Sequence, residues 1–499
     1  MKPIQVVICA AILIVATVGC GEDEPGGEGT AGSGGTAGTS GTAGTGGSGG
    51  GVAGSGGQGG SGGHGGGSVE PPIVCTDQCH YVRPGATGAD TGESWSDAFP
   101  AIPDDLSRGH VYLLADGDYG GYTLDDPASG TDEIWLRKAT IADHGTDEGW
   151  LDEYGDGVAL FSNVTFDGSY FVLDGTKGGG PTGWDSGHGI EIERTGTVCT
   201  DNGSLLTFAA GASHVSVRHV HAHAASNDYP MDGVKGTGGA SELTLAYTSI
   251  HTTFGPTFHI GDWTDAVIEQ SYLADVRSTG AGDPYCEHWH AEGISSIGTN
   301  QNITIRHNIW DRIGGTAVFA GVNTGQSIGW KIYGNTFARS VTTLYYYYDA
   351  STTNQQTMDD LEFYNNNVVH MPGSSVGTIV IQSGSNNVVQ NNIWYDNIAN
   401  TFVMSGVTHD YNLFAENRRI EGCSPVCEKD DEGATGEAHG QVGSGSPFAA
   451  DDPDPRIADL HLAAPTDPGV TLNAPFDTDA EGRTRGADGT WDRGMYELD

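Results

Sequence analysis

Four titratable residues occupy related positions in a short sequence motif that recurs in the middle of the chain. Lys235 and His259 each follow a large apolar residue in one copy of the phrase, and Asp232 and Glu292 stand near the beginning of two copies. An amine or an imidazole can act as a general base, and two carboxylates can supply an acid and a base. We therefore predict an enzyme site at these residues.

The phrase alternates with a period of two, which is typical of β-strands. If its apolar residues point inward, Lys235 and His259 point outward on adjacent coils of one shared face. We interpret the following copies as one strand of each coil: GHGIEI (187–192), MDGVKG (231–236), TFHIG (257–261), AEGIS (291–295), TAVFAG (316–321), TLYYYY (343–348) and TIVIQ (378–382).

An inserted loop over residues 275–294 returns to this face and brings further titratable residues with it. Long loops and clustered titratable groups are where functional sites tend to lie. The alternative is that the carboxylates cap turns and the histidines are ordinary surface residues, as we expect for His188. The predicted catalytic residues are Asp232, Lys235, His259, His290 and Glu292, and the predicted substrate contacts are Arg277, His288, Trp289 and Tyr346.

Three chemistries fit these residue types. A polysaccharide lyase needs a base for the C5 proton of a uronate, which Lys235 or His259 can supply, and a cation such as Ca²⁺, which Glu292 can hold. An inverting glycoside hydrolase needs two carboxylates, and two strand spacings would separate Asp232 from Glu292 by about 9.6 Å. A transition metal held by His259, His290 and Glu292 is the third option, without a supporting motif.

A surface protein that binds glycan without cleaving it is the alternative of a different class. Trp289, Trp330 and the tyrosine run 345–348 supply aromatic surface, and alternation turns about half of that run outward. Aromatic faces stack on sugars in enzymes and in binding proteins alike. The convergent histidines, glutamate and lysine favour an enzyme, so we predict a lyase that acts on a uronate-containing polysaccharide.

The second half of the chain repeats a longer phrase, in which an apolar residue and two variable positions precede an Asn and large apolar residues. Successive copies are 20 to 37 residues apart, which indicates a solenoid rather than a β-sandwich with Asn-rich turns. Asn tolerates the left-handed region, so we expect the repeated Asn to adopt it. Stacked at about 4.8 Å, such residues form an amide ladder. The slot falls at positions 220, 248, 271, 308, 335, 366, 392 and 412, with Asn308, Asn335, Asn366 and Asn392 on one corner.

The chain resembles the right-handed parallel β-helix proteins of the pectate-lyase-like superfamily over residues 80–499. Residues 81–106 and VYLLADGDYGGYTL (111–124) are similar to the entry of such helices, where a short strand and a capping helix precede the first coil. The ending TDAEGRTRGADGTWDRGMYELD (478–499) is similar to the closing phrase of the family.

This resemblance implies an all-β fold, a single right-handed parallel β-helix with an N-terminal cap and long loop insertions, and a groove on its broad parallel face. Related lyases use a Lys and an Arg with a Glu-x-Glu calcium pair. Here the corresponding residues are His290-Ala291-Glu292, which departs from that pattern.

The first residues indicate export. An apolar segment from Ile4 to Val18 ends at Gly19 and Cys20, as in a bacterial lipoprotein signal peptide. Residues 25–68 are almost wholly Gly, Ser, Thr and Ala, a composition typical of a disordered tether. We predict a signal peptide over 1–19, a lipidated Cys20 with a linker over 20–68, and a folded domain over 69–499. The protein would be a monomer at the outer membrane or cell surface, or otherwise secreted.

The cysteines after Cys20 are even in number, so all of them can pair as disulfides. Such pairing is typical of proteins in an oxidising compartment. A metal site is the alternative, but the spacing within the close pairs is not that of known zinc sites. The predicted disulfides are Cys75–Cys79, Cys199–Cys286 and Cys423–Cys427.

The net charge of −44 limits the classes of molecule that the protein can bind. A phosphate backbone needs clustered basic residues, so nucleic-acid binding is excluded. The same field slows the approach of a polyanionic glycan unless a local cation offsets it. The membrane is expected to be a partner only through the lipid anchor.

Overall fold

The computed structural model describes twelve stretches of the chain and two single residues. They are residues 78–181, 183–195, 203–225, 232–251, 255–276, 291–320, 324–346, 348, 351, 353–372, 379–398, 403–404, 407–418 and 437–498. The predicted signal peptide, the lipidated Cys20 and the tether lie outside the described residues. No helix among the described residues is long and apolar enough to cross a membrane.

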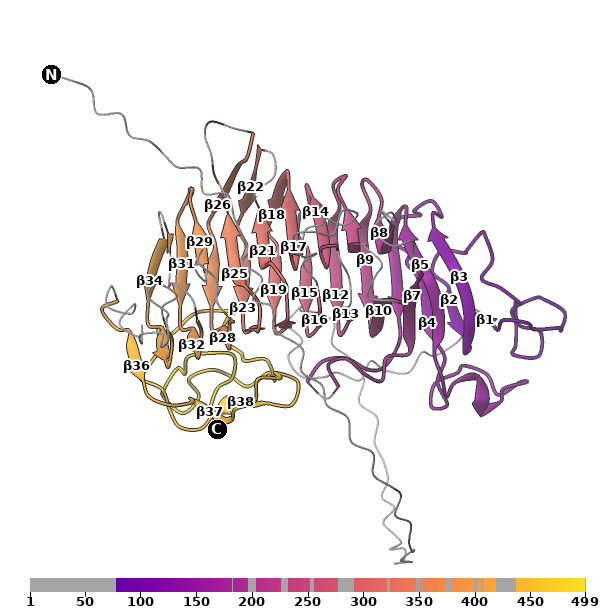
Figure 1. The fold of residues 1–499 in the computed structure, drawn as a ribbon. Coiled ribbons are helices and arrows are strands. Elements are labelled where there is room, and N and C mark those ends of the chain that lie inside the picture. Colours follow the sequence, from indigo (N-terminus) through magenta and orange to yellow (C-terminus); the bar gives the residue numbers. More distant parts are fainter. Residues whose placement is uncertain are drawn as a thin grey trace, which may run out of the picture. The chain divides into compact units, whose positions relative to one another are not determined.

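The described chain winds as a right-handed parallel β-helix, which confirms the predicted fold class. Successive coils place their strands side by side from β1 to β36 (Figure 1). One face, called the β12 face, contains β1 (Cys79–Val82), β2 (Val111–Leu114), β4 (Ile134–Lys138), β6 (Ser169–Asp174), β9 (Ser213–Arg218), β12 (Ser241–Ala246), β15 (Val267–Glu269), β19 (Thr304–Arg306), β23 (Lys331–Tyr333), β27 (Glu362–Tyr364), β31 (Asn387–Gln390) and β34 (Val407–Asp410).

The second sheet divides at β5 (Ala159–Phe166), whose first half pairs with β7 and whose second half pairs with β8. The β10 face continues as β7 (Ile190–Arg194), β10 (Val220–Ala224), β13 (Ser249–His251), β16 (Tyr272–Ala274), β20 (Ile309–Asp311), β24 (Thr336–Ala338), β28 (Asn367–Val369), β32 (Ile393–Tyr395), β35 (Leu413–Ala415) and β36 (Gln441–Gly443). The β11 face continues as β8 (Ser204–Phe208), β11 (Asp232–Gly236), β14 (Phe258–Gly261), β17 (Ile294–Ile297), β21 (Thr316–Ala320), β25 (Thr342–Tyr346), β29 (Ile379–Ile381) and β33 (Val403–Met404).

A few short elements complete the coil. The first coil uses β3 (Gly117–Leu124), which pairs with β5. A small parallel sheet joins the β11 and β12 faces and contains β18 (Thr299–Gln301), β22 (Thr324–Ile328), β26 (Gln355–Asp359) and β30 (Gly384–Ser385). One 3-10 turn, Asp152–Tyr154, and the antiparallel pair β37 (Phe448–Ala450) and β38 (Asp459–Leu462) lie outside the faces.

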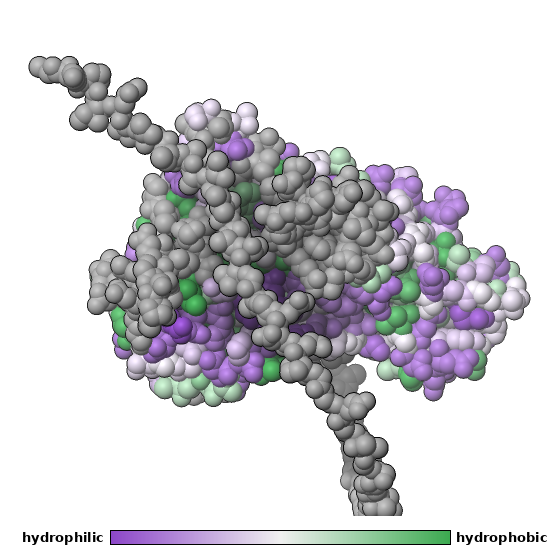
Figure 2. Space-filling view, viewed as in Figure 1, coloured by the Kyte–Doolittle hydropathy of each residue, from purple (hydrophilic) through white to green (hydrophobic). Residues whose placement is uncertain are grey.

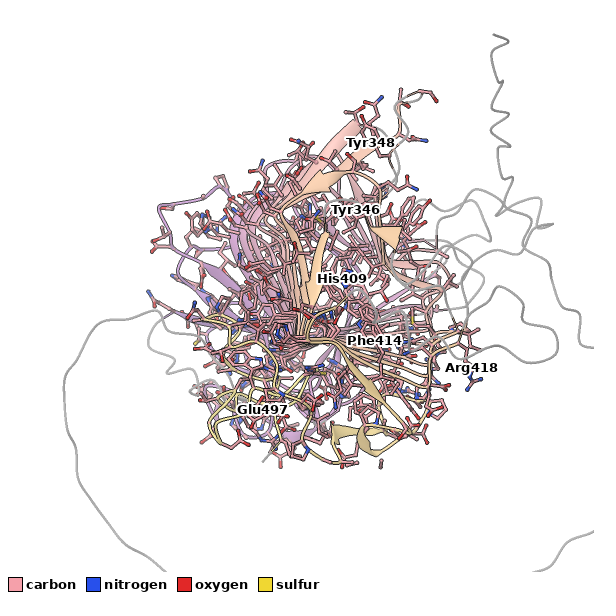
Figure 3. The ribbon with its side chains drawn as sticks, turned by 90° about the vertical axis from the view of Figure 1, so that its left-hand side faces the viewer. Tyr346, Tyr348, His409, Phe414, Arg418 and Glu497 are labelled. Atoms are coloured by element: carbon pink, nitrogen blue, oxygen red, sulfur yellow. The ribbon has the colours of Figure 1, made fainter. Side chains whose placement is uncertain are left out.

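The interior of the coil is filled by the apolar residues of all three faces, since alternation buries every second side chain. Trp310, Phe337, Phe363, Trp394 and Phe414 stack in this order, with ring centroids 5.9 to 6.3 Å apart. Figure 3 looks along the coil and shows Phe414 where the strands converge, with Tyr348 and Arg418 at the periphery. The visible described surface is mostly hydrophilic with scattered hydrophobic residues (Figure 2), in keeping with the high net charge.

The predicted amide ladder is confirmed at the corner between the β12 and β10 faces. The side-chain nitrogen of Asn308 donates to the carbonyl oxygen of Asn335 at 3.0 Å, and Asn335 donates in turn to Asn366 at 3.0 Å. Asn366 donates to Asn392 at 3.1 Å, and Asn392 to Asn412 at 2.9 Å. We call this row the asparagine corner.

The conformation predicted for the repeated Asn is wrong. The left-handed residue is the one before each rung, and the rungs themselves are not among the residues of positive φ. The reason is geometric, because the bend turns the chain so that the next side chain points into the corner. In the two slots nearest the ladder's start, Thr248 and Ser271 bond to each other at 2.9 Å. The bend residues are His219, Tyr247, Gln270, His307, Gly334, Asn365, Asn391 and Tyr411.

The closing phrase of the sequence covers the outside of the asparagine corner. The indole nitrogen of Trp491 donates to the side chain of Asn365 at 3.2 Å, and Gln270 donates to the carbonyl of Ala480 at 2.9 Å. The segment is held together by a buried ion pair of Arg485 with Glu497 at 3.4 Å. Burial raises the pKa of the Glu497 carboxyl to about 6.

Two expectations about elements are wrong. The N-terminal cap contains turns instead of a helix between β1 and β2, because Pro84, Pro100 and Pro103 interrupt this segment. The copy GHGIEI belongs to the β10 face through β7, since β7 pairs with β10 and not with β8. Alternation is the same on every face, so it does not reveal which face a strand joins.

Candidate functional site

The β11 face carries an outward row that the strand register aligns. Lys235 pairs with His259, His259 with Ser295, Ser295 with Phe319, and Phe319 with Tyr345. Lys235, His259, Phe319 and Tyr345 are partly exposed, whereas their neighbours Val234, Phe258, Ile260, Ile294, Val318 and Leu344 are fully buried. We call these outward positions the β11 row. Lys235 and His259 therefore point outward on adjacent coils, as predicted.

The carboxylate of Asp232 contacts both of these residues. Its Oδ2 atom lies 3.2 Å from Nδ1 of His259 and 3.5 Å from Nζ of Lys235. The Asp232 side chain is 6% exposed, whereas those of Lys235 and His259 are 35% and 30% exposed. The carboxylate is thus screened from water, while the amine and the imidazole are open to a ligand on the face.

This arrangement prepares the imidazole to accept a proton. When Nδ1–H of His259 donates to Asp232, the lone pair of the ring is on Nε2. A buried carboxylate in this position fixes the tautomer and stabilises the imidazolium that forms. Lys235 adds a cationic group beside the base, where it can attract the carboxylate of a substrate.

Glu292 occupies the same register position as Asp232, two coils further along. The pairing of Val234 with Phe258 and of Phe258 with Ile294 places Pro256 between the two carboxylates. The Glu292 residue is 8% exposed, so its carboxylate is mostly buried. Asp232 and Glu292 are thus aligned as predicted, but neither presents a well-exposed carboxylate.

The strands around Glu292 offer few oxygen ligands to a calcium ion. The continued register gives it Pro256 on one side and Thr316 on the other, so it is the one carboxylate that these described strands supply there. Calcium takes six to eight oxygen ligands. The described residues therefore do not build a calcium site by themselves.

An aromatic pair lies further along the β11 row. The rings of Phe319 and Tyr345 are stacked with centroids 5.8 Å apart and an interplanar angle of 3°. Tyr346, the predicted substrate contact, is instead fully buried, and its hydroxyl lies 3.0 Å from Oγ of Ser327. Trp330, also expected at the surface, is fully buried too. A one-residue error in register exchanges the two sides of a strand, which explains Tyr346.

Of the other predicted residues, some lie within and some outside the described residues. His188 is buried and its Nε2 lies 3.1 Å from the carbonyl oxygen of Tyr247, which agrees with a structural role. Burial lowers the pKa of His188 to about 4. Outside the described residues are Arg277, His288, Trp289 and His290, and at least one cysteine of each predicted disulfide, so these predictions stay predictions.

The sequence interpretation missed a second group of titratable residues, on the β10 face. Glu191 and Glu193 lie on β7, and His221 and His223 lie beside them on β10. The signal was present as two period-two motifs, Glu-x-Glu and His-x-His. They are about thirty positions apart in the sequence, and only the strand register brings them together.

Comparison with known proteins finds distant similarity only. No protein-family model and no curated protein matches the chain. Among solved structures, it is similar to pectate lyase Pel9A, with a TM-score of 0.45 and 14% identity over 85% of this chain and 98% of that one. It is also similar to the PL6 family polysaccharide lyase Pedsa3628 from Pseudopedobacter saltans, with a TM-score of 0.38 and 11% identity over 77% of this chain and 96% of that one.

A mannuronic acid specific polysaccharide family 6 lyase from human gut microbiota gives a TM-score of 0.35 and 11% identity over 68% of this chain and 75% of that one. Similarity at this level is too weak to establish a fold. The β-helix fold of this chain is established by its own strand pairing. Its activity has to be inferred from the site.

Proposed function

We propose that the protein is a polysaccharide lyase that cleaves a uronate-containing glycan on the β11 face. The observation that carries the proposal is the contact of one screened carboxylate, Asp232, with both His259 and Lys235. His259 is the base, Lys235 neutralises the uronate carboxylate, and Asp232 positions both.

The reaction follows from these roles. Nε2 of His259 removes the proton at C5 of the uronate, the C4–O bond breaks, and a double bond forms between C4 and C5. The imidazolium then returns its proton to the departing oxygen, so atoms and charge balance. Neutralisation of the uronate carboxylate by Lys235 makes the C5 proton more acidic, and this is the step in which a positioned cation helps most.

The aromatic pair supports a polymeric substrate. Phe319 and Tyr345 continue the row that contains Lys235 and His259, so a glycan chain lying along the row reaches both places. The local cation also offsets the repulsion that a net charge of −44 exerts on a polyuronate.

The test is an assay of the full-length protein on a panel of uronate polysaccharides, read as ultraviolet absorbance of the unsaturated product. Wild-type protein is expected to act on at least one of them, and Lys235→Ala/His259→Ala to be inactive while still folded. Parallel assays with EDTA test the predicted calcium dependence. Glycan binding without any product would overturn the enzyme assignment and favour a binding protein.

We also propose that the protein is exported and anchored through a lipid on Cys20. The support is the signal segment and the Gly-rich stretch that follows it. Cys20→Ser is expected to release the protein from the membrane fraction. Unchanged partitioning of this variant would contradict the anchor.

A further inference from the structure

A lattice of Glu and His side chains lies on the β10 face, on other strands than those of the proposed lyase site. Glu191 is paired with His221, and Glu193 with His223, across adjacent parallel strands. On the next strand His251 continues the second of these rows. The neighbouring residues of these strands, Ile190, Ile192, Val220 and Ala222, are fully buried, so the lattice points outward.

Three ligand atoms of this lattice converge. Nε2 of His223 lies 2.8 Å from Oε1 of Glu191 and 3.9 Å from Oε2 of Glu193. One ligand atom from each of the three residues can be chosen so that all lie within 4.8 Å of one another. Two carboxylates that approach one imidazole in this way need a positive charge between them, which a proton or a metal ion supplies.

The hydrogen bonding of His223 suits a metal ligand. Its Nδ1 atom lies 3.1 Å from the carbonyl oxygen of Ala224. When Nδ1–H donates to that oxygen, the lone pair is on Nε2, on the side of the two glutamates. A histidine that binds metal through one nitrogen usually donates from the other to a carbonyl or a carboxylate.

His221 adds a second imidazole beside the cluster. Its ring centroid lies 4.7 Å from those of both His223 and His251. Its Nδ1 atom is buried and has no hydrogen-bond partner among the described residues. A neutral imidazole binds a metal through its unprotonated nitrogen, so His221 can supply a further ligand beside the cluster.

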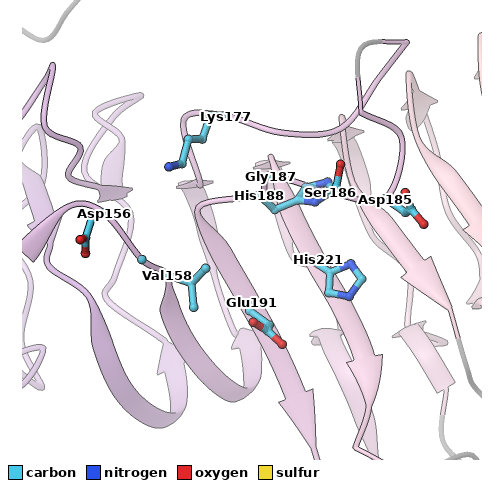
Figure 4. A pocket seen from close by; sticks show the side chains of 10 residues that line it. Asp156, Val158, Lys177, Asp185, Ser186, Gly187, His188, Glu191 and His221 are labelled. Atoms are coloured by element: carbon cyan, nitrogen blue, oxygen red, sulfur yellow. The ribbon is translucent and has the colours of Figure 1, made fainter. Parts of the chain in front are cut away.

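A cavity of about 300 Å³ borders the lattice and opens beside it. Glu191 and His221 line both the cavity and the lattice, and Figure 4 shows them on neighbouring strands below His188 and Lys177. Asp156 and Asp185 also line it. The lattice is therefore bordered by an open cavity that carries further carboxylates, and Glu193 at its outer side is itself exposed to solvent.

We propose that Glu191, Glu193 and His223 bind a divalent first-row transition ion of the Zn²⁺ class, with His221 as a neighbouring ligand. Imidazole favours transition metals, whereas Ca²⁺ and Mg²⁺ prefer oxygen ligands alone. The site lies on β7 and β10, whereas the proposed lyase residues lie on β11 and β14, so the two proposals stand or fall separately.

The test is titration of chelator-treated, full-length protein with Zn²⁺ by calorimetry and with Co²⁺ by visible absorption. Wild-type protein is expected to bind one equivalent tightly, with weaker binding as the pH falls because protons compete for the ligands. His223→Ala and Glu191→Gln are each expected to weaken this binding about 10- to 100-fold. Ca²⁺ is not expected to displace Co²⁺ from the site.

His214→Ala is the matched control, because His214 forms a comparable ion pair with Glu242 at 2.8 Å on another part of the coil. This variant is expected to bind the metal like the wild type. Absence of a one-equivalent site in the wild type, or equal binding by His223→Ala and His214→Ala, would overturn the proposal. Far-ultraviolet circular dichroism confirms that each variant is folded.

Discussion

Two rows of side chains run from coil to coil, and they differ in how their residues vary along the row. At the asparagine corner, the same amide returns on five successive coils and bonds to its own kind. On the β11 row, each coil presents a different residue: Lys235, His259, Ser295, Phe319 and Tyr345.

The difference distinguishes positions that support the fold of a solenoid from positions that bind or convert a substrate. A repeated buried amide satisfies the backbone at a bend, and that need is identical in every coil. A reacting substrate needs a base, a cation and a stacking surface in different places, so a row that serves it cannot repeat. The two rows should therefore respond in opposite ways to mutation.

The largest effect is expected for the base. His259→Ala is expected to lower turnover about 10²- to 10⁴-fold, the usual loss for a general base. The midpoint of urea unfolding should hardly change, because the ring is partly exposed. Steady-state kinetics and urea denaturation of the same preparation measure both. Normal turnover would break the assignment of the β11 row.

The asparagine corner should show the reverse pattern. In Asn366, the carbonyl oxygen accepts two bonds from Asn335 and the amide donates to Ile332 and to Asn392. Asn366→Ala leaves several buried partners unpaired, so the free energy of unfolding should fall by about 3–5 kcal/mol. Denaturant titration measures this loss, and the exposed Asn473→Ala is the control with little effect. Equal stability of the two variants would contradict the structural role of the ladder.

Asp232 should give a smaller, selective effect, because it acts through His259. An amide in place of the carboxylate can donate to Nδ1 and leave the lone pair on the wrong nitrogen. Asp232→Asn is expected to reduce kcat about 10- to 100-fold with little change in KM. A rise in KM at constant kcat would instead place Asp232 in substrate binding.

The aromatic end of the β11 row should affect binding alone. Tyr345→Ala removes one ring of the stacked pair and is expected to raise KM about threefold to tenfold without lowering kcat. Tyr346→Phe, which changes a buried neighbour, is the control with unchanged kinetics. If the buried change alters KM and the exposed one does not, the substrate lies elsewhere.

One bend residue of the asparagine corner should make the free energy of unfolding depend modestly on pH. Burial, and then Arg306 and Arg485, lower the pKa of His307 from 6.5 to about 3. The unfolded chain therefore takes up a proton first, and the stability contributed by the neutral ring, complete above pH 6.5, is lost progressively as the pH falls toward 3.

His307→Asn tests this contribution, because Asn365 and Asn391 adopt the same left-handed conformation on later coils. The measurement is the urea midpoint at about pH 7.5 and about pH 5. The variant is expected to lose less stability than the wild type between these values. An identical loss in both proteins would contradict a neutral, buried His307.

The repeat predicted more of the fold than of the site. Rungs such as Asn366 were identified because their spacing and apolar neighbours recur. In the run Asn365-Asn366-Asn367, however, three identical residues do three jobs: Asn365 bends the chain, Asn366 forms a rung, and Asn367 accepts a bond from Met495. Residue type alone does not distinguish these jobs.

The candidate site was predicted where a strand register could be read directly. Lys235 and His259 share a phrase, and their alignment followed from it. The contact of Asp232 with both depends on how the strand begins, and the partnership of Glu193 with His223 depends on which face β7 joins. Both are tertiary facts that alternation does not encode. The misplacement of Tyr346 has a different cause, a shift of one position within the alternation of its own strand.

The most direct test of the central claim is the mass of the oligosaccharide products formed in water enriched in heavy oxygen. Elimination at His259 and Lys235 predicts one unsaturated product end for each bond cleaved, with no solvent oxygen beyond the slow exchange at the reducing ends. Incorporation of heavy oxygen into saturated products would show hydrolysis instead, and would contradict the lyase mechanism on the β11 face.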